Sequence, residues 1–445
     1  MNKNIYILGL VGAALFSACS TSDDLSIGDS SAVDTAKESV LIYEAGQNSE
    51  VPITLGVGQS RGYTRAPIGD ESENPTYSSF STEAGKYLGV FCLATDYQTP
   101  YKTNHPIDNN WKEDGTGLSA WMKNVPATTS NVDGKVAFLN HDRKGEQSYY
   151  YPLGNWMKYN FYTYYPWQKE SVKVKVSKIE NSVEVTEEVE KTTLVFRQDQ
   201  VFEKFYTIDG SQDIIWGKAT PPAADAFSAN YFIENNGSAE SPQLKFDHKL
   251  VQFKFYLKAD NSKVKAKIKQ VRDMYITHGI NYLELVVADK NNPENNGNLY
   301  WFGNKLKKER MFIKLDGSDK KRFHQEDGES LDSPLENEDI SYKDPVYVGY
   351  IMLAPPSIPS FNATYSKDAN ASEDSESEEP ESEDSESENK YVYKLQVRVK
   401  CYGSSKDVYP IFELDPTKHG LETFEAGKIY NIVINIKSSH LGLSE

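Results

Sequence analysis

The 445-residue chain is poor in cysteine and histidine, the residues that most often build metal sites and nucleophilic centres. It has three cysteines and seven histidines, and no histidine lies in an H-E-x-x-H or another metal-ligand spacing. No Cys-x-x-Cys and no phosphate-binding P-loop occur in the sequence. We therefore expect a protein that is not an enzyme and that holds no metal and no cofactor.

Positive charge is scarce as well. The chain has 48 Lys and Arg against 65 Asp and Glu, a formal net charge of −17. Without a positive field to attract phosphates, nucleic acid is excluded as an expected partner. Residues 371–390 alone carry ten acidic side chains and one lysine. They have almost nothing to bury, so we expect a disordered acidic loop between two strands.

Long hydrophobic runs are absent except near the N-terminus. The apolar run Ile5–Phe16 is too short to cross about 30 Å of hydrocarbon, so residues 1–18 are expected to be an export signal. The signal ends in Ser17-Ala18-Cys19, which resembles the lipobox of bacterial lipoproteins, whose cysteine carries acyl chains such as palmitate. The alternative is an ordinary signal peptide with a chance cysteine. Lipidated Cys19 predicts an outer-membrane anchor at the cell surface, with residues 19–38 as a flexible tether.

Apolar residues in the remaining chain recur mostly with period two, the period of β-strands. The runs Val172–Val176 and Val183–Glu187 alternate on either side of Asn181-Ser182 and predict a hairpin whose lysines face glutamates. Two further runs alternate in the same way. The first contains Val51, Ile53, Leu55 and Val57, and the last clear strand contains Ile432, Ile434 and Ile436.

Many short strands separated by turns, with no long amphipathic helix, are typical of β-sandwiches. A chain of this length is expected to form two or three domains. The stretch Thr220–Pro242 is rich in proline, alanine and Asn-Gly, and we expect the domain boundary there. The expected division is an N-terminal sandwich over 39–230 and a C-terminal sandwich over 231–445.

Five motifs resemble, in order, those of the fimbrillin family in its Mfa-like branch. They span most of residues 40–437 and comprise Tyr87–Phe91, Tyr150–Pro152 with Tyr159–Pro166, Asp213–Gly217, Phe246–Leu250 and Phe424–Tyr430. Considered without the resemblance, the residues of these motifs indicate structural roles. Pro152 and Pro166 end strands, because proline has no N–H to donate to a ladder. His248 is expected to be a hydrogen-bonded core residue.

The resemblance implies an all-β fold of two tandem transthyretin-like β-sandwich domains that assemble into surface fimbriae. In such families a protease removes the lipidated N-terminal strand after an arginine, and the opened groove accepts a strand from a neighbouring subunit. The resemblance makes the two alternating strands described above, at residues 51–57 and 432–436, the candidates for exchange. Thr64-Arg65-Ala66 looks like that cleavage site, whereas the simpler interpretation is a surface loop with two basic residues, Arg61 and Arg65. The expected partners are other fimbrial subunits in a homo- or heteropolymer, the outer membrane through the lipid, and host or bacterial surface ligands.

Some alternatives stay open at this stage. Only eight residues, 438–445, follow the last strand, so an acceptor-only or anchor position competes with a stalk position. Cys92 and Cys401 either pair or remain free thiols. A different function is a monomeric surface glycan-binding lipoprotein whose exposed aromatics stack on sugars, although core packing explains the same residues. The candidates are Trp111, Trp121, Trp156 and Trp167.

Overall fold

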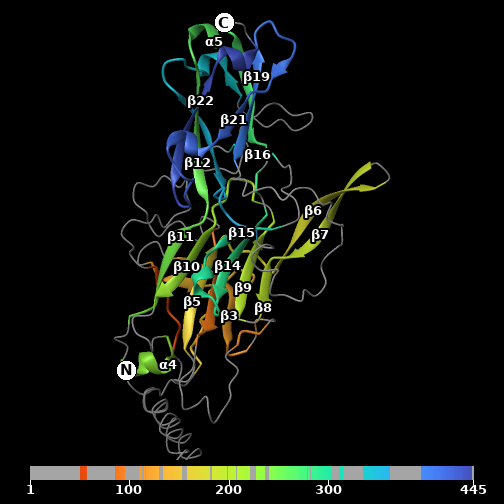
Figure 1. The fold of residues 1–445 in the computed structure, drawn as a ribbon. Helices are drawn as coiled ribbons and strands as arrows, with labels where there is room; N and C mark the ends of the chain where they lie inside the picture. Colours follow the sequence, from red (N-terminus) through yellow and green to blue (C-terminus); the bar gives the residue numbers. More distant parts are fainter. Residues whose placement is uncertain are drawn as a thin grey trace, which may run out of the picture.

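A computed structural model shows the chain as two β-rich bodies stacked end to end (Figure 1). The structure describes residues 51–57, 86–95, 110–112, 115, 117–129, 134–152, 158–180, 183–197, 199–206, 208–220, 227–235, 240–277, 279–280, 282–302, 310–313, 334–360 and 392–442. The expected signal 1–18, the tether 19–38 with Cys19, the processing site Arg65-Ala66 and the acidic stretch 371–390 lie outside the described residues.

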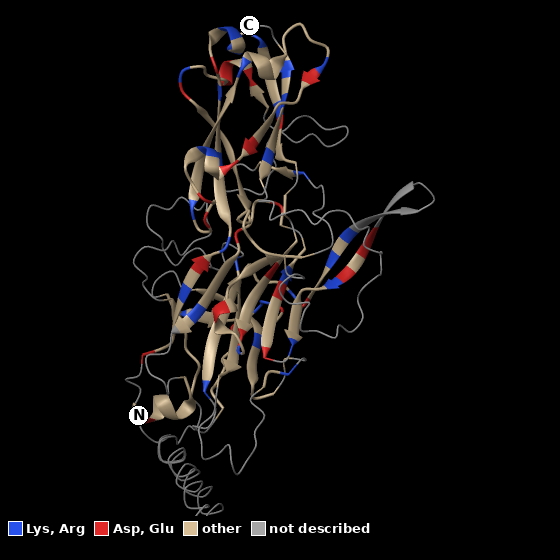
Figure 2. Cartoon of the chain, viewed as in Figure 1, with Lys and Arg blue, Asp and Glu red and all other residues tan. Residues whose placement is uncertain are grey.

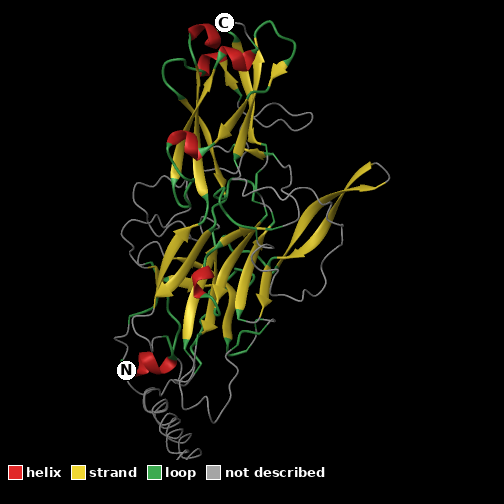
Figure 3. Ribbon diagram, in the orientation of Figure 1, coloured by secondary structure: helices red, strands yellow, loops and turns green. Residues whose placement is uncertain are grey.

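Strands dominate the described residues, which confirms the expected all-β fold class (Figure 3). The helices are short: α4 (Ala229–Glu234), α5 (Ser262–Lys265), and the 3-10 turns η4 (Pro293–Asn295), η5 (Asn337–Asp339), η6 (Pro416–His419) and η7 (Ser438–Leu441). Within the described parts of the chain, no helix is long and apolar enough to cross a membrane.

The first body packs a seven-stranded sheet against a four-stranded sheet. The seven-stranded sheet has the order β1 (Gly56–Val57), β11 (Gln243–His248), β10 (Ile215–Thr220), β5 (Tyr159–Tyr165), β2 (Leu88–Ala94), β3 (Ala120–Thr129), β4 (Val136–Phe138). The four-stranded sheet has the order β15 (Leu299–Trp301), β14 (Leu283–Asp289), β9 (Gln200–Phe205), β8 (Leu194–Arg197). Buried aromatics fill the space between them, with the rings of Tyr164 and Phe205 6.2 Å apart.

The second body also consists of two sheets that enclose apolar side chains. One has the order β18 (Val346–Leu353), β12 (Val251–Ala259), β22 (Ile429–Ile436). The other has the order β16 (Met311–Phe312), β13 (Ile268–Ile276), β19 (Tyr393–Cys401), β20 (Asp407–Val408), with β17 (Leu335–Glu336) beside β13 and β21 (Ile411–Leu414) beside β19. Because side chains alternate along a strand, β19 buries Leu395, Val397 and Val399 and turns the residues between them outward.

A two-stranded hairpin, β6 (Ser171–Glu180) and β7 (Val183–Thr192), projects from the side of the first body (Figure 1). It confirms the hairpin predicted from the alternation. Lys173 lies opposite Glu190, and Lys175 lies opposite Glu188. The basic strand and the acidic strand are visible side by side in Figure 2. These side chains are exposed, so each pair contributes little, about 0.2–1 kcal/mol.

The sheets do not divide at the boundary expected near residue 230. β10 and β11, on either side of the stretch 220–242, are neighbours in the seven-stranded sheet of the first body. β14, from further along the chain, pairs with β9 in the same body. The stretch rich in turn residues is therefore a connection within one sheet. Turn composition marks the end of a strand, and it does not tell whether the next strand stays in the same body.

The two bodies share one continuous core. Buried apolar residues form a single cluster that runs from Phe91 and Phe205 in the first body to Phe253 and Val397 in the second. The connection between β11 and β12 is only two residues long, 249–250. The loop at Gly210 also reaches the second body, because the Met352 N–H donates to the Gly210 carbonyl at 2.8 Å. Both the core and the backbone therefore join the bodies.

Candidate functional site

Residues 51–57, here called the closing segment, join the two ends of the seven-stranded sheet. On one side, Gly56 and Val57 run parallel to β11, opposite Gln243 and Leu244. On the other side, Gly56 forms an antiparallel bridge with Lys135, next to β4. β11 and β4 stand at opposite ends of the strand order, so the closing segment covers a backbone edge at each end.

Backbone hydrogen bonds hold the closing segment along its length. It would otherwise present a row of unpaired N–H and C=O groups beside two open sheet edges. The Ile53 N–H donates to the Tyr149 carbonyl at an N···O distance of 2.8 Å. Four more N–H groups donate to carbonyls at 2.9 Å: Tyr151 to Val51, Gly56 to Pro242, Val57 to Gly134, and Val136 to Leu55.

The closing segment also completes a hydrophobic core. Ile53, Leu55 and Val57 are 4%, 1% and 6% exposed, while Pro52 and Thr54 between them are exposed. The three buried side chains pack in one cluster with apolar residues of the seven-stranded sheet, which are Leu88, Val90, Cys92, Met122, Val125, Phe138, Phe161, Ile215, Leu244 and Phe246 among others. Burying a Val, Leu or Ile side chain is worth about 1.5–3 kcal/mol, so the segment contributes to stability through its side chains as well as its backbone.

The second group of strand-exchange candidates lies on β22, in the other body. β22 runs parallel to β12 at the end of the three-stranded sheet, with Ile432 opposite Phe255. Ile434 and Ile436 are buried at 3% and 0%, and Ile432 is partly buried, so the predicted apolar face points into the core. The structure thus places the two groups of candidate residues in different bodies.

Three of the family-like motifs meet where the bodies join. His248, at the end of β11, bonds through Nδ1 to Oδ2 of Asp213 at 2.5 Å, and both side chains are almost fully buried. Gly427, in the middle of the last motif, donates its N–H to the Leu250 carbonyl at 2.8 Å and adopts a φ of +76°. His248 is therefore a hydrogen-bonded core residue, as predicted. The three motifs contact one another at the junction between the two bodies.

Comparison with known proteins gives distant structural likenesses. No protein-family model matches the chain, and no curated protein matches it. Nine solved protein chains do match. A fimbrial protein from Bacteroides vulgatus is 12% identical, with 87% of this chain and 95% of that chain covered and a TM-score of 0.42. A Bacteroides uniformis protein provisionally described as a cell adhesion protein is 12% identical, with 88% and 95% covered and a TM-score of 0.38.

A third match has the same provisional description. It comes from Bacteroides fragilis and is 9% identical, with 87% of this chain and 93% of that chain covered and a TM-score of 0.33. These descriptions agree with the fimbrillin resemblance of the sequence motifs. With identities and TM-scores this low, the likeness itself assigns neither topology nor function to the chain.

The described residues hold no group of three or more His, Cys, Asp or Glu side chains arranged to bind a metal ion. The turn after β14, whose sequence faintly resembles a calcium loop, is organised by Asp289 instead. Its carboxylate accepts hydrogen bonds from the Asn292 N–H at 2.8 Å, Gln200 Nε2 at 3.0 Å and Asn295 Nδ2 at 3.2 Å. Protein donors therefore occupy the oxygens that a cation would need.

Cys92 and Cys401 are free thiols that lie in different bodies. Cys92 is fully buried in β2, and burial raises the pKa of its thiol well above the usual value. A thiol in this environment stays protonated and unreactive at neutral pH. This outcome favours the free-thiol alternative over a bridge between the two cysteines.

One sequence pattern outside the motifs described above is typical of a class of hydrolases. Residues 58–62 read Gly-Gln-Ser-Arg-Gly, which is the G-x-S-x-G spacing of nucleophile elbows. An elbow needs a strand followed by a helix at the edge of a mostly parallel sheet. β1, which precedes the pattern, belongs to a sheet whose other described pairings are antiparallel, and residues 58–62 themselves lie outside the described residues. The pattern carries no catalytic assignment.

The tryptophans proposed to stack on sugars have different environments. Trp111 is 1% exposed and donates from Nε1 to the Ala94 carbonyl at 2.8 Å. The ring of Trp167 lies 5.1 Å from the guanidinium of Arg143. Trp156 lies outside the described residues. Trp121 is 38% exposed beside the equally exposed Tyr150, to whose carbonyl it donates at 2.7 Å.

Sequence reasoning missed the partners of the closing segment. Gly134–Val136 and Tyr149–Tyr151 receive it on one side, and Pro242–Leu244 receive it on the other. The alternation of residues 51–57 predicted a strand with one buried face. Its partners are about 80 to 190 positions away, and nothing local in their sequence marks them as neighbours.

Proposed function

We propose that this chain is a fimbrillin-like structural and adhesion subunit of surface fimbriae. It is exported as a lipoprotein through Cys19, anchored in the outer membrane, and assembled by β-strand exchange. In this proposal the closing segment is a placeholder. Proteolysis between Arg65 and Ala66 detaches it from the body, and a strand of a neighbouring subunit then takes its place between β11 and β4.

The bonding of the closing segment carries the proposal. It is the first described strand, and it satisfies two sheet edges and one hydrophobic core at once. Removing it would expose both edges together with an apolar groove, and unpaired edges of this kind readily pair with another chain. An incoming strand would gain the same main-chain hydrogen bonds, while its alternate side chains would fill the sites of Ile53, Leu55 and Val57.

The position of Arg65 fits removal of the whole segment. Arg65 follows Val57 by eight positions and precedes β2, so it lies between the closing segment and the rest of the body in the sequence. A cut after Arg65 leaves the closing segment without a covalent link to the body, so only the noncovalent contacts described above would retain it. A longer or better-fitting donor strand would then displace it.

The test is the N-terminal residue of the protein recovered from the cell surface, determined by mass spectrometry. We expect Ala66, together with a ladder of polymers on gels run without heating. Arg65→Ala should leave acylated Cys19 as the first residue and abolish the ladder, while the matched variant Arg61→Ala should behave as the wild type. Wild-type surface protein that begins at Cys19 would contradict the proposal.

A second function rests on the exposed pair Trp121 and Tyr150. Exposed aromatic rings suit stacking on a sugar, so a monomeric glycan-binding lipoprotein is the alternative. Under this alternative, Trp121→Ala would abolish retention on immobilised neutral glycans while the surface protein kept its closing segment. A variant that binds as the wild type would remove the support for this alternative.

A further inference from the structure

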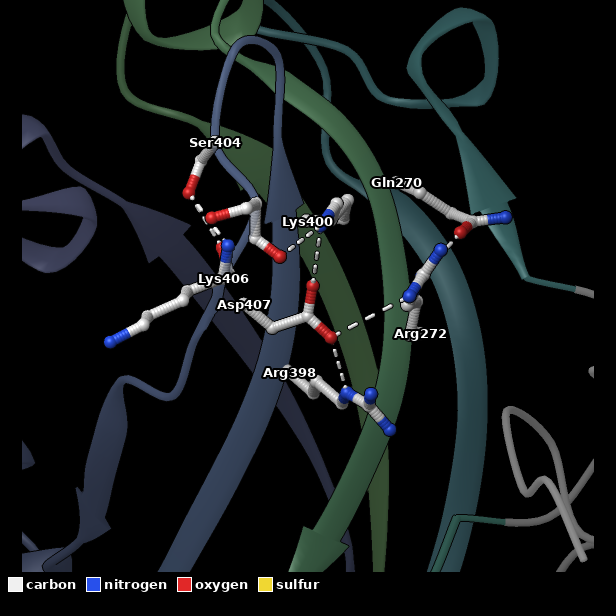
Figure 4. Close-up of polar contacts among 8 residues, drawn as sticks. Gln270, Arg272, Arg398, Lys400, Ser404, Lys406 and Asp407 are labelled. Atoms are coloured by element: carbon white, nitrogen blue, oxygen red, sulfur yellow. Dashed lines mark hydrogen bonds and ion pairs between the residues drawn. The ribbon is translucent and has the colours of Figure 1, made fainter. Parts of the chain in front are cut away.

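Four positively charged side chains gather on the outer face of the larger sheet of the second body. They are Arg272 on β13, Arg310 before β16, and Arg398 and Lys400 on β19, and we call them the basic patch. This gathering stands out in a chain whose net charge is −17. Figure 4 shows Arg272, Arg398 and Lys400 converging on one carboxylate, that of Asp407 on β20.

A β-bulge explains why these side chains share one face. The pairing of β13 with β19 shifts register between Val271 and Asp273. Val271 and Met274 remain in the core, so the extra residue at the bulge lets Arg272 and Asp273 both lie on the outer side. Bulges commonly redirect a side chain in this way. On β19, ordinary alternation puts Arg398 and Lys400 on the same face.

The carboxylate of Asp407 forms ion pairs with three of the four side chains of the basic patch. Its carboxylate lies 2.7 Å from Arg398 Nε, 3.6 Å from Arg272 Nη1 and 3.6 Å from Lys400 Nζ. The Asp407 side chain is only 7% exposed, while those of Arg398 and Arg272 are 31% and 29% exposed. The negative charge is therefore buried, and the two guanidinium groups that it holds are partly exposed, while Lys400 is 18% exposed and donates to the Ser405 carbonyl at 2.9 Å.

The terminal groups of Arg398 remain available to a ligand. Its contact with Asp407 uses Nε, and in Figure 4 the two terminal nitrogens point away from that carboxylate. Arg310 is exposed and its guanidinium lies 4.8 Å from the ring of Tyr275. Two other carboxylates lie on this face, Asp273 among the arginines and Glu336, which bonds to Gln270 at its margin.

An exposed aromatic ring borders the basic patch. Tyr409 is 49% exposed, and the Arg398 guanidinium lies 5.9 Å from its ring centre. A guanidinium fork binds carboxylate or sulfate groups in two-point fashion, and an exposed aromatic face stacks on the apolar face of a sugar ring. Arginine side chains beside an exposed tyrosine therefore suit the binding of a sugar that carries an acidic group.

We propose that the basic patch binds an anionic polysaccharide whose sugars carry carboxylate or sulfate groups. Arg398, Arg310 and Arg272 would hold the acidic groups, and Tyr409 would stack on the sugar ring. An acidic peptide would use the cations but gain little from the tyrosine. The proposal is independent of strand exchange, because the basic patch and the closing segment lie in different bodies.

The test is equilibrium binding of the purified chain to dextran sulfate and to polygalacturonate, with neutral dextran and poly-glutamate as comparison polymers. We expect both acidic polysaccharides to bind, with affinity that falls as salt is raised. Arg398→Gln and Arg310→Gln should each weaken binding by roughly tenfold, the loss expected for one charge-assisted hydrogen-bonding group. Tyr409→Ala should weaken binding to the polysaccharides and leave binding to poly-glutamate unchanged.

Two controls separate binding from folding and from total charge. Arg310→Gln leaves the Asp407 contacts intact, so its effect does not depend on the ion pairs that hold β20. The double variant Lys173→Gln/Lys175→Gln removes two positive charges from the exposed hairpin and should bind as the wild type. Failure of both acidic polysaccharides to bind, or binding that the arginine variants leave unchanged, would overturn the proposal. Equal, Tyr409-independent binding to poly-glutamate would overturn the assignment to a polysaccharide.

Discussion

Single carboxyl groups in this protein have environments that make stability and binding depend on pH. Glu284 on β14 is 1% exposed, and its Oε1 has no hydrogen-bond partner. Burial raises the pKa of its carboxyl to about 7, against the partial opposing effect of Lys204 and Arg197. The folded protein therefore binds this proton more tightly than the unfolded chain does.

Glu284 predicts that the free energy of unfolding falls as the pH rises. The stabilisation from this proton is complete below the carboxyl pKa of about 4.5 in the unfolded chain. It is lost as the pH rises through the pKa of about 7 in the folded protein, a change of about 3 kcal/mol in the free energy of unfolding. Glu284→Gln should flatten the profile between pH 4 and pH 8 in denaturant titrations by that amount. The exposed control Glu188→Gln should reproduce the wild-type profile. Parallel profiles for Glu284→Gln and the wild type would contradict this role.

Asp273 predicts a pH dependence of anion binding at the basic patch. Burial raises the pKa of its carboxyl to about 6, although Arg398 and Arg310 oppose the shift. Protonation below this value removes a negative charge from the basic patch, while the carboxylate of Asp407, whose pKa is lowered by the hydrogen bond from Arg398, stays ionised. Binding of dextran sulfate should therefore tighten from pH 7.5 to pH 5, and Asp273→Asn should bind tightly at both. Equal tightening in the variant would assign the effect to another group.

At the scale of elements, the closing segment shows what alternation in a sequence reveals. Residues 51–57 were expected to bury every second side chain, and Ile53, Leu55 and Val57 are buried. Alternation also predicted the β6–β7 hairpin and the inward face of β22, because both depend on local sequence alone. It did not predict that β1 runs parallel to β11, since strand pairing depends on residues far apart in the chain.

Stability measurements can test the closing segment directly. Leu55→Ala should lower the free energy of unfolding by about 3 kcal/mol, because it leaves a cavity in a core where Leu55 is 1% exposed. Thr54→Ser, at the neighbouring exposed position, keeps the hydroxyl that meets Ser241 Oγ at 2.7 Å and should change it by less than about 0.5 kcal/mol. Denaturant unfolding of the unprocessed chain measures both. Equal, small effects would mean that the segment is not part of the folded core.

The basic patch illustrates what sequence reasoning does not reach. Arg272 and Arg398 are 126 positions apart, and they share a face only because a bulge shifts the register of β13. No local sequence pattern marks a bulge, which arises from how two strands fit together. The 48 Lys and Arg against 65 Asp and Glu indicated an acidic protein. The cluster of positively charged side chains became visible only in the three-dimensional structure.

At the scale of the whole molecule, the shared core predicts cooperative unfolding. Apolar residues of both bodies belong to one cluster, and the Asp213–His248 pair and the Gly210 loop lie at the junction. Calorimetry of the unprocessed chain should therefore give one transition, with equal calorimetric and van't Hoff enthalpies. Gly210→Val should lower the transition temperature, because a Cβ there would lie 2.4 Å from Ile351 Cγ1 at a φ of +87°. Two resolved transitions would show that the bodies unfold separately.

The passage of the chain between the bodies has a consequence for the order in which the protein folds during synthesis. β9 finds its neighbour β14 only after β12 and β13 of the other body have been made. The last strand, β22, then returns to β12 across more than 150 residues. Neither body can finish folding from the N-terminus as the chain emerges. The high sequence separation of these contacts predicts slow folding, and a chain whose strands pair only after all of them have been made avoids trapping half-built sheets.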